Sequence, residues 1–255
     1  MFLQSYVVPV CLYDIKNDVA VLKSHYGTAF FINSSGIFLT AQHVLNSAYI
    51  DAKNKNLNVG LVVKDDNGKN IKSVIVDIKD KEYAPAPFDV AVGVTSYKCD
   101  SYLTFKEQDV SVWQDVATMG YPLNAVSGEP DALMFNLRVH KGYIQRVLPP
   151  GTLRLANNPE SFELSFLLCK GLSGAPIFIH SGEKDFVIGV CVGSARTETL
   201  ENEFSEIQEN GDVYKEKIMK IEEFGIANDI RPLLSWKPSI LSGKSLNCLI
   251  NSDNS

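Results

Sequence analysis

Three residues of this chain have side chains that together can perform nucleophilic catalysis. Ser173 lies in a glycine-rich turn, His43 follows an apolar run, and Asp89 begins another apolar run. A serine hydroxyl becomes a nucleophile at neutral pH when an imidazole takes its proton, and a carboxylate can hold that imidazole in place. The order His, Asp, Ser along the chain is one of the known orders of such a triad. The three residues therefore predict an acyl-transfer site.

The turn around the serine matters as much as the hydroxyl. It reads Gly171-Leu172-Ser173-Gly174-Ala175-Pro176. Glycines accept backbone angles that other residues avoid. The N–H groups of Gly171 and Ser173 can then converge on the oxyanion that forms during attack, and one such donor typically lowers a barrier by ~2.7–4 kcal/mol. The alternative interpretation is an ordinary glycine-rich β-turn.

His43 is the candidate base because it follows the strand-like residues 36–40 and opens a short helical stretch. Its ordinary pKa of about 6.5 suits proton transfer near neutral pH. The alternative is a partly buried structural histidine. His25, His140 and His180 are weaker candidates, since none has a flanking pattern that fixes it near the serine.

Asp89 is the candidate that orients the imidazole. It precedes the apolar residues 90–94, so we expect it to be partly buried, and a buried carboxylate needs a partner such as an imidazole N–H. The alternative is an aspartate that caps a strand. Asp77 and Asp80 fit less well, because the first interrupts a strand and the second lies in a charged stretch.

Composition limits the classes of partner. The 255 residues carry a net charge of -6, which argues against binding to nucleic acid or an anionic membrane. The five cysteines are an odd number without metal-ligand spacing, so we expect reduced thiols, a cytoplasmic location, no metal and no cofactor. The first 20 residues lack the basic start of a signal peptide, and no run of 18 apolar residues occurs.

Short runs rich in valine, isoleucine, phenylalanine and tyrosine, separated by turn residues, predict an all-β fold. Tight turns are expected at residues 33–36, 66–69 and 181–185. Only residues 42–48 and 212–224 show helical patterns. We expect an N-terminal β-barrel over residues 1–105, a C-terminal β-barrel over residues 106–241 and a polar tail over residues 242–255.

These motifs resemble those of trypsin-like serine peptidases with the chymotrypsin fold, especially the HtrA-like and bacterial stand-alone branches. Residues 27–32 and 39–44 are similar to the family's His motif, and residues 88–92 to its Asp motif. Residues 119–122 and 171–176 resemble its second-barrel turn and its Ser motif. The resemblance implies two six-stranded antiparallel β-barrels with the active site in the cleft between them, and a short C-terminal helix.

Residue by residue, the resemblance makes His43 the base, Asp89 its orienting carboxylate and Ser173 the nucleophile, with the oxyanion held by the N–H groups of Gly171 and Ser173. It places the substrate pocket at six residues, none of them acidic: Leu167, Leu168, Cys191, Val192, Gly193 and Ser194. We therefore expect an apolar or small side chain there rather than arginine or lysine.

The chain also departs from the family pattern. Leu172 stands where digestive members have an aspartate that pairs with a new N-terminus, so we expect no such activation. HtrA proteins usually carry an export signal and a PDZ domain, and neither is expected here. Residues 196–213 are strongly acidic and predict a lid, a recruiter of basic substrate segments, or a solvated loop.

The sequence thus predicts a serine endopeptidase that acts on protein or peptide substrates through an acyl-enzyme. One form of this prediction is a regulated intracellular effector protease that an activating protein controls. The alternative is a catalytically silent trypsin-like domain that binds peptides or is regulated by a partner. Neither reading involves nucleic acid or a membrane.

Overall fold

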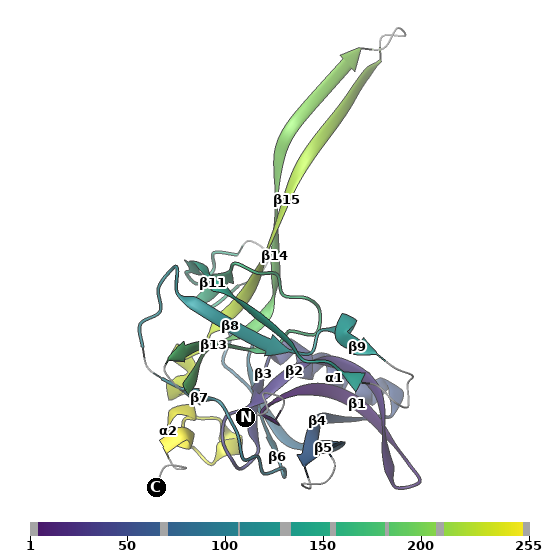
Figure 1. Cartoon of the computed structure of the whole chain (residues 1–255), viewed down its shortest axis with the longest axis vertical. Coiled ribbons are helices and arrows are strands. Elements are labelled where there is room, and N and C mark those ends of the chain that lie inside the picture. The colour runs from purple at the N-terminus through teal and green to yellow at the C-terminus, as the bar shows by residue number, and fades with distance from the viewer. Residues whose placement is uncertain are drawn as a thin grey trace.

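Two β-sheets form the body of the protein, and a long β-hairpin projects from the second sheet (Figure 1). The computed structural model describes residues 5–66, 71–106, 108–127, 134–153, 157–181, 184–207 and 212–251. The two sheets hold the side chains of the candidate site from different parts of the chain, so their architecture decides whether those side chains meet.

The first sheet is a closed antiparallel barrel. Its strands follow the order β1 (Val7–Lys16), β2 (Val19–Phe31), β3 (Ile37–Thr40), β6 (Ala91–Thr95), β5 (Ile71–Tyr83) and β4 (Asn58–Asp66). Aromatic and β-branched residues dominate these strands, as is usual for strands packed on one face. Phe30, Leu39 and Leu61 are completely buried in its core.

The second sheet closes on itself in the same way. It runs in the order β13 (Pro176–Ser181), β8 (Asp115–Gly120), β11 (Arg138–Leu148), β12 (Ser161–Leu164), β15 (Val213–Asp229) and β14 (Lys184–Ile207), and β14 pairs back to β13. The short β7 (Thr104–Phe105) adds in parallel to β14. Ile144, Phe162 and Ile177 fill its core. The predicted all-β, chymotrypsin-like fold is confirmed.

Several short elements complete the chain. β9 (Val126–Ser127) and β10 (Met134–Phe135) form a separate two-stranded ribbon. Among the described residues, 3₁₀ helices lie at Leu123–Ala125, Arg231–Ser235 and Ser239–Leu241. The predicted limits of the two barrels remain a prediction. One strand before the proposed boundary, β7, pairs with the second sheet.

Helix α1 (Gln42–Lys55) begins where residues 42–48 predicted a helix and continues for two further turns. It buries Val44, Leu45, Ala48 and Ala52 against the first barrel, a stripe with helical spacing. It ends at Asn56, whose left-handed φ of 54° is a common helix terminus.

The prediction of a helix over residues 212–224 is wrong, because this segment lies in strand β15. Its apolar residues have near-helical spacing, but each backbone position is paired with β14, from Ile207↔Val213 inward. An isolated helix of this length is marginal in water, whereas the strand extends a ladder that already exists in the second sheet.

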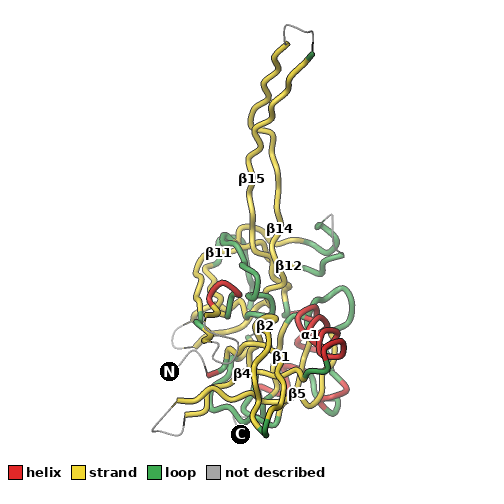
Figure 2. Tube along the Cα trace, turned by 90° about the vertical axis from the view of Figure 1, so that its right-hand side faces the viewer, coloured by secondary structure: helices red, strands yellow, loops and turns green. Residues whose placement is uncertain are grey.

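The predictions of a lid or a loop over residues 196–213 are also wrong for the described part of that segment. Residues up to 207 continue β14, and the two strands form a twisted ribbon that points away from both barrels (Figures 1 and 2). We call residues 196–207 and 213–223 of this ribbon the arm.

The predicted C-terminal helix is α2 (Leu246–Asn251). It lies within the segment predicted as a polar tail, yet Leu246 and Leu249 are buried in the first core.

The expected turn at residues 33–36 is present, with Gly36 at a φ of 84°. The centres of the turns expected at 66–69 and 181–185 lie outside the described residues. In the part of the chain that is described, none of the helices is long and apolar enough to span a bilayer.

If α2 is part of the folded core, Leu246→Ala should lower the free energy of unfolding by about 2–5 kcal/mol, because it leaves a cavity in a fully buried site. Asn247→Ala changes the exposed neighbour and should change stability by less than about 0.5 kcal/mol. Chemical denaturation measures both. Equal stability of the two variants would show that this segment is not packed.

Candidate active site

His43 and Asp89 are locked together at the start of α1. The imidazole Nδ1 lies 2.6 Å from Asp89 Oδ2, and the backbone N–H of His43 donates to Asp89 Oδ1 at 2.9 Å. A carboxylate only accepts hydrogen bonds, so Nδ1 carries the hydrogen and Nε2 keeps its lone pair. With 45% of the His43 side chain exposed, this geometry leaves Nε2 able to take a proton from a neighbour.

Asp89 also caps the helix. The residue before α1, Ala41, has no side-chain oxygen to accept the first free N–H groups, and Asp89 does so from a distant part of the chain. The positive end of the helix dipole stabilises the carboxylate at this position. The same interaction therefore fixes the start of the helix and the orientation of the imidazole.

The second sheet holds Asp89 from behind. Asn228, on β15 and only 2% exposed, accepts the backbone N–H of Asp89 through its side-chain oxygen at 2.8 Å. Its amide nitrogen donates to Ser161 Oγ at 3.3 Å. Sequence reasoning missed Asn228. Its only signal in the sequence is an amide side chain directly after the apolar residues Ile226 and Ala227.

The nucleophile turn is held by hydrogen bonds from all sides. The carbonyl of Lys170 accepts the N–H of Leu123 at 2.8 Å, and the N–H of Leu172 donates to Cys169 O at 3.0 Å. Because C=O and N–H point in opposite directions across a trans peptide, the N–H of Gly171 points away from Leu123.

The rest of the turn is equally well partnered. The N–H of Gly174 donates to Cys191 O at 2.7 Å, and that of Ala175 to Leu172 O at 2.9 Å. Among the described residues, none accepts the N–H of Gly171 or of Ser173. A buried turn that leaves two donors unmatched is a ready site for an anionic oxygen.

Two glycines make this turn possible. A Cβ on Gly174 would lie 2.0 Å from Thr28 O, and one on Gly171 would lie 2.6 Å from Tyr121 O. Both residues also adopt positive φ, 85° and 97°. No larger residue fits at either position without moving the backbone.

Thr28, on β2 of the first barrel, joins that barrel to the turn. Its N–H donates to Ser173 O at 2.9 Å, and its hydroxyl donates to Gly171 O at 2.8 Å. The same hydroxyl accepts the N–H of Tyr121 at 3.0 Å. Thr40 in turn donates its hydroxyl to Thr28 O at 2.7 Å. Sequence reasoning missed both threonines, because a threonine in a strand is common.

Two close approaches bring the start of α1 and the nucleophile turn to the same stretch of β2. A Cβ on Gly27 would lie 2.7 Å from the side chain of Val44 and 2.8 Å from Ser173 O. The Cβ position of Gly174 is 3.0 Å from the N–H nitrogen of Ala41. The helix start and the nucleophile turn therefore flank the same stretch of β2, and Asp89 is bonded to that helix start.

Two of the residues predicted for the substrate pocket, Leu168 and Ser194, contact each other. The N–H of Leu168 donates to Ser194 Oγ at 3.3 Å, and the hydroxyl of Ser194 donates back to Leu168 O at 3.1 Å. Cys191 is buried against Thr118, while Leu167 is 39% exposed. Apart from its two chain neighbours, no described residue lies within 4 Å of the Cβ position of Gly193, so space is open beside it.

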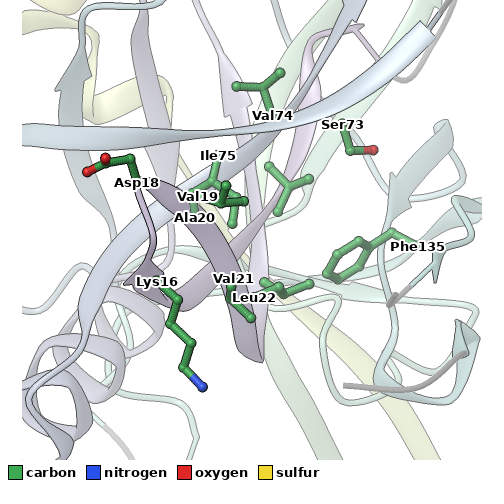
Figure 3. Close-up of a pocket in the computed structure, with 11 residues that line it drawn as sticks. Lys16, Asp18, Val19, Ala20, Val21, Leu22, Ser73, Val74, Ile75 and Phe135 are labelled. Carbon is green, nitrogen blue, oxygen red and sulfur yellow. The ribbon is translucent and has the colours of Figure 1, made fainter. Parts of the chain in front are cut away.

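A cavity of about 620 Å³ lies elsewhere, between the β1–β2 hairpin and β5 (Figure 3). Val19, Leu22, Val74 and Phe135 give it a largely apolar lining, and none of the site residues contributes to it. Lys16 and Asp18 are its charged residues, and they form no constellation for catalysis. Within the described segments, no group of three or more histidine, cysteine, aspartate or glutamate side chains is placed to hold a metal ion.

Comparison with known proteins places the chain in a family. The family model of the trypsin-like peptidase domain matches residues 27–190, well over half of the chain. The chain belongs to the trypsin-like peptidase domain family. The resemblance drawn from the His, Asp and Ser motifs is thereby confirmed. The comparison with curated proteins found no significant match.

Solved structures of this fold are similar over most of the chain. The apo MamO protease domain from Magnetospirillum magneticum matches with a TM-score of 0.52 and 13% identity, covering 91% of this chain and 95% of that one. The HtrA-type protease AlgW with a tripeptide gives a TM-score of 0.56 and 15% identity, covering 93% of this chain and 60% of that one. The active form of the Rv3671c protease from M. tuberculosis gives 0.51 and 19%, covering 75% and 71%. At these identities the likeness supports the fold alone.

The other three histidines have partners of their own rather than the side chain of Ser173. His25 is partly buried beside Phe135 and donates from Nε2 to Gly27 O, and desolvation lowers its pKa to about 4. His140 stacks on Phe166, and burial followed by the charge of Arg138 lowers its pKa. His180 pairs with Asp185 at 2.8 Å.

The low pKa of His25 predicts acid sensitivity of the fold. The unfolded chain binds a proton at His25 below about pH 6.5, but the folded chain does so only near pH 4, so stability should fall as pH decreases through this window. The loss is about 3 kcal/mol at most, and His25→Phe should flatten the slope. Urea unfolding at pH 7, 6, 5 and 4.5 measures it. The same slope in both proteins would assign the acid sensitivity to other groups.

Proposed function

We propose that this protein is a serine endopeptidase that cleaves peptide bonds through Ser173, His43 and Asp89. The observation that carries the proposal is the anchored imidazole beside a turn with two unmatched N–H donors. Membership of the trypsin-like peptidase family supports it. The finer assignment of roles rests on the geometry of the site.

The reaction has two steps. Ser173 Oγ attacks the peptide carbonyl while His43 Nε2 takes its proton, and His43 returns that proton to the leaving amine as the C–N bond breaks. Water, deprotonated by the same Nε2, then attacks the acyl-enzyme, and Nε2 returns that proton to Ser173 Oγ as the ester C–O bond breaks and the carboxylic acid is released. Asp89 stabilises the imidazolium that forms in each step through its bond to Nδ1.

The N–H groups of Gly171 and Ser173 stabilise the negative oxygen of each tetrahedral intermediate. Lys170 O accepts the N–H of Leu123 rather than that of Ser173, which supports this role for the Ser173 N–H. Leu172 is completely buried where digestive members of the family have an aspartate. The turn is held by Thr28 and needs no ion pair with a new N-terminus.

We propose protein or peptide substrates with an apolar or small side chain in the pocket of Leu167, Leu168, Cys191, Val192, Gly193 and Ser194. No acid lies among these residues to pair with arginine or lysine. AlgW was solved with a tripeptide and with a decapeptide, which supports a peptide ligand for this fold. Five free cysteines support a reducing, cytoplasmic setting, where an activating protein could regulate the enzyme.

A fluorophosphonate probe tests the nucleophile and the base. The wild type should be labelled, Ser173→Ala should not, and His43→Ala should be labelled at least about 10³-fold more slowly because the hydroxyl keeps its proton. Ser111→Ala, an exposed serine, serves as the matched control and should be labelled like the wild type. A folded wild type that is not labelled would favour a silent peptide-binding domain or one that awaits an activator.

The role of Asp89 is tested by Asp89→Asn. The amide can donate to Nδ1 and so favours the wrong tautomer, and kcat should fall roughly 10³–10⁴-fold while the side chain still caps α1. Asp77→Asn, on β5, is the control and should keep full activity. Less than a tenfold loss in Asp89→Asn would remove Asp89 from the mechanism.

A further inference from the structure

The arm exposes many large apolar side chains to solvent. All described residues from 196 to 207 and from 213 to 223 are exposed. They include eight large apolar side chains: Leu200, Phe204, Ile207, Val213, Tyr214, Ile218, Met219 and Ile221. A two-stranded ribbon is marginally stable alone, and three or more strands are usually needed. The arm is therefore expected to become part of a sheet with more than two strands.

Both outer edges of the arm are open among the described residues. β15 pairs with β12 only over Gly225–Asn228, and beyond that point its second edge meets no strand. β14 leaves its other neighbours, β13 and β7, by Val190. Each edge offers a row of backbone N–H and C=O groups that another strand can pair with.

The two edges differ in charge. Residues 196–207 of β14 carry four glutamates and one arginine, a net charge of -3, and the arginine already pairs with Glu198 at 2.7 Å. A second copy aligned on β14, centred on Asn202, would place Glu198 opposite Glu206 and Glu201 opposite Glu203. Like charges directly opposite are destabilising, so the charges disfavour pairing of this edge with the β14 edge of a second copy.

The β15 edge is self-complementary. Residues 213–223 carry three lysines and three glutamates, a net charge of zero. When this whole stretch pairs antiparallel with its own copy, the symmetry axis passes through its centre, Ile218. Glu216 then faces Lys220 of the second copy on both sides of the axis, and Ile218 faces Ile218.

No like charges face one another directly in this register. Lys215 and Lys217 face Ile221 and Met219, and Glu222 and Glu223 face Tyr214 and Val213. A two-fold axis perpendicular to the sheet keeps each side chain on its own face, as antiparallel pairing requires. Because the arm points away from the barrels, the two bodies lie at opposite ends of the joined arms (Figures 1 and 2).

We propose that the protein forms a symmetric dimer in which β15 of one arm pairs antiparallel with β15 of a second copy, residues 213–223 against residues 223–213. The two ribbons become one four-stranded sheet, with the acidic β14 strands as its outer edges. This assembly is independent of the proposed peptidase activity.

A charge swap tests the proposed register. Light scattering after size exclusion at about 50 μM should give twice the 28.2 kDa of one chain. Glu216→Lys or Lys220→Glu alone places like charges opposite each other twice and should weaken the dimer roughly 10- to 100-fold. The double variant Glu216→Lys/Lys220→Glu restores both opposite pairs and should dimerise like the wild type.

Two further samples separate the interface from damage to the arm. Mixing the Glu216→Lys chain with the Lys220→Glu chain should give a heterodimer, because each lysine then meets a glutamate. Glu206→Lys makes the same charge change on β14 and should leave the dimer intact. The proposal is overturned if the wild type is monomeric at this concentration, if Glu216→Lys dimerises like the wild type, or if neither the double variant nor the mixture recovers.

Discussion

The hydrogen bonds of Thr28 are the constraint on which the candidate site depends. This one residue of the first barrel binds the Ser173 carbonyl through its N–H, the Gly171 carbonyl through its hydroxyl, and Tyr121 and Thr40 through its remaining groups. It is completely buried, so each of these bonds lies where an unmatched partner would be costly. The turn keeps its shape because the first barrel holds it from one side and Cys191 from the other.

In a second contact between the barrels, a residue of the second barrel holds a residue of the first. Asn228, from the second sheet, holds the backbone of Asp89, and Asp89 holds both the start of α1 and the His43 ring. Each sheet thus positions the functional group of the other. Such an arrangement fixes the relative placement of imidazole and hydroxyl as long as the two sheets stay packed. A change of packing between them would disturb both groups together.

The sequence points to the residues of the candidate site, but not to the residues that hold them in place. His43, Asp89 and Gly171–Ser173 were identifiable because their chemistry requires particular residue types within short motifs. Thr28 and Asn228 were not, because their importance comes from partners more than 130 residues away in the chain. The arm was missed for a related reason. Val213, Ile218 and Ile221 have helix-like spacing, and only the preceding strand, β14, makes the segment extended.

The structure of a covalent phosphonate adduct would test the central claim most directly. We predict phosphorus bonded to Ser173 Oγ, its phosphoryl oxygen about 3 Å from the nitrogens of both Gly171 and Ser173, and His43 Nε2 within hydrogen-bonding reach of Ser173 Oγ. An adduct on another residue, or an oxygen that points away from both N–H groups, would contradict it.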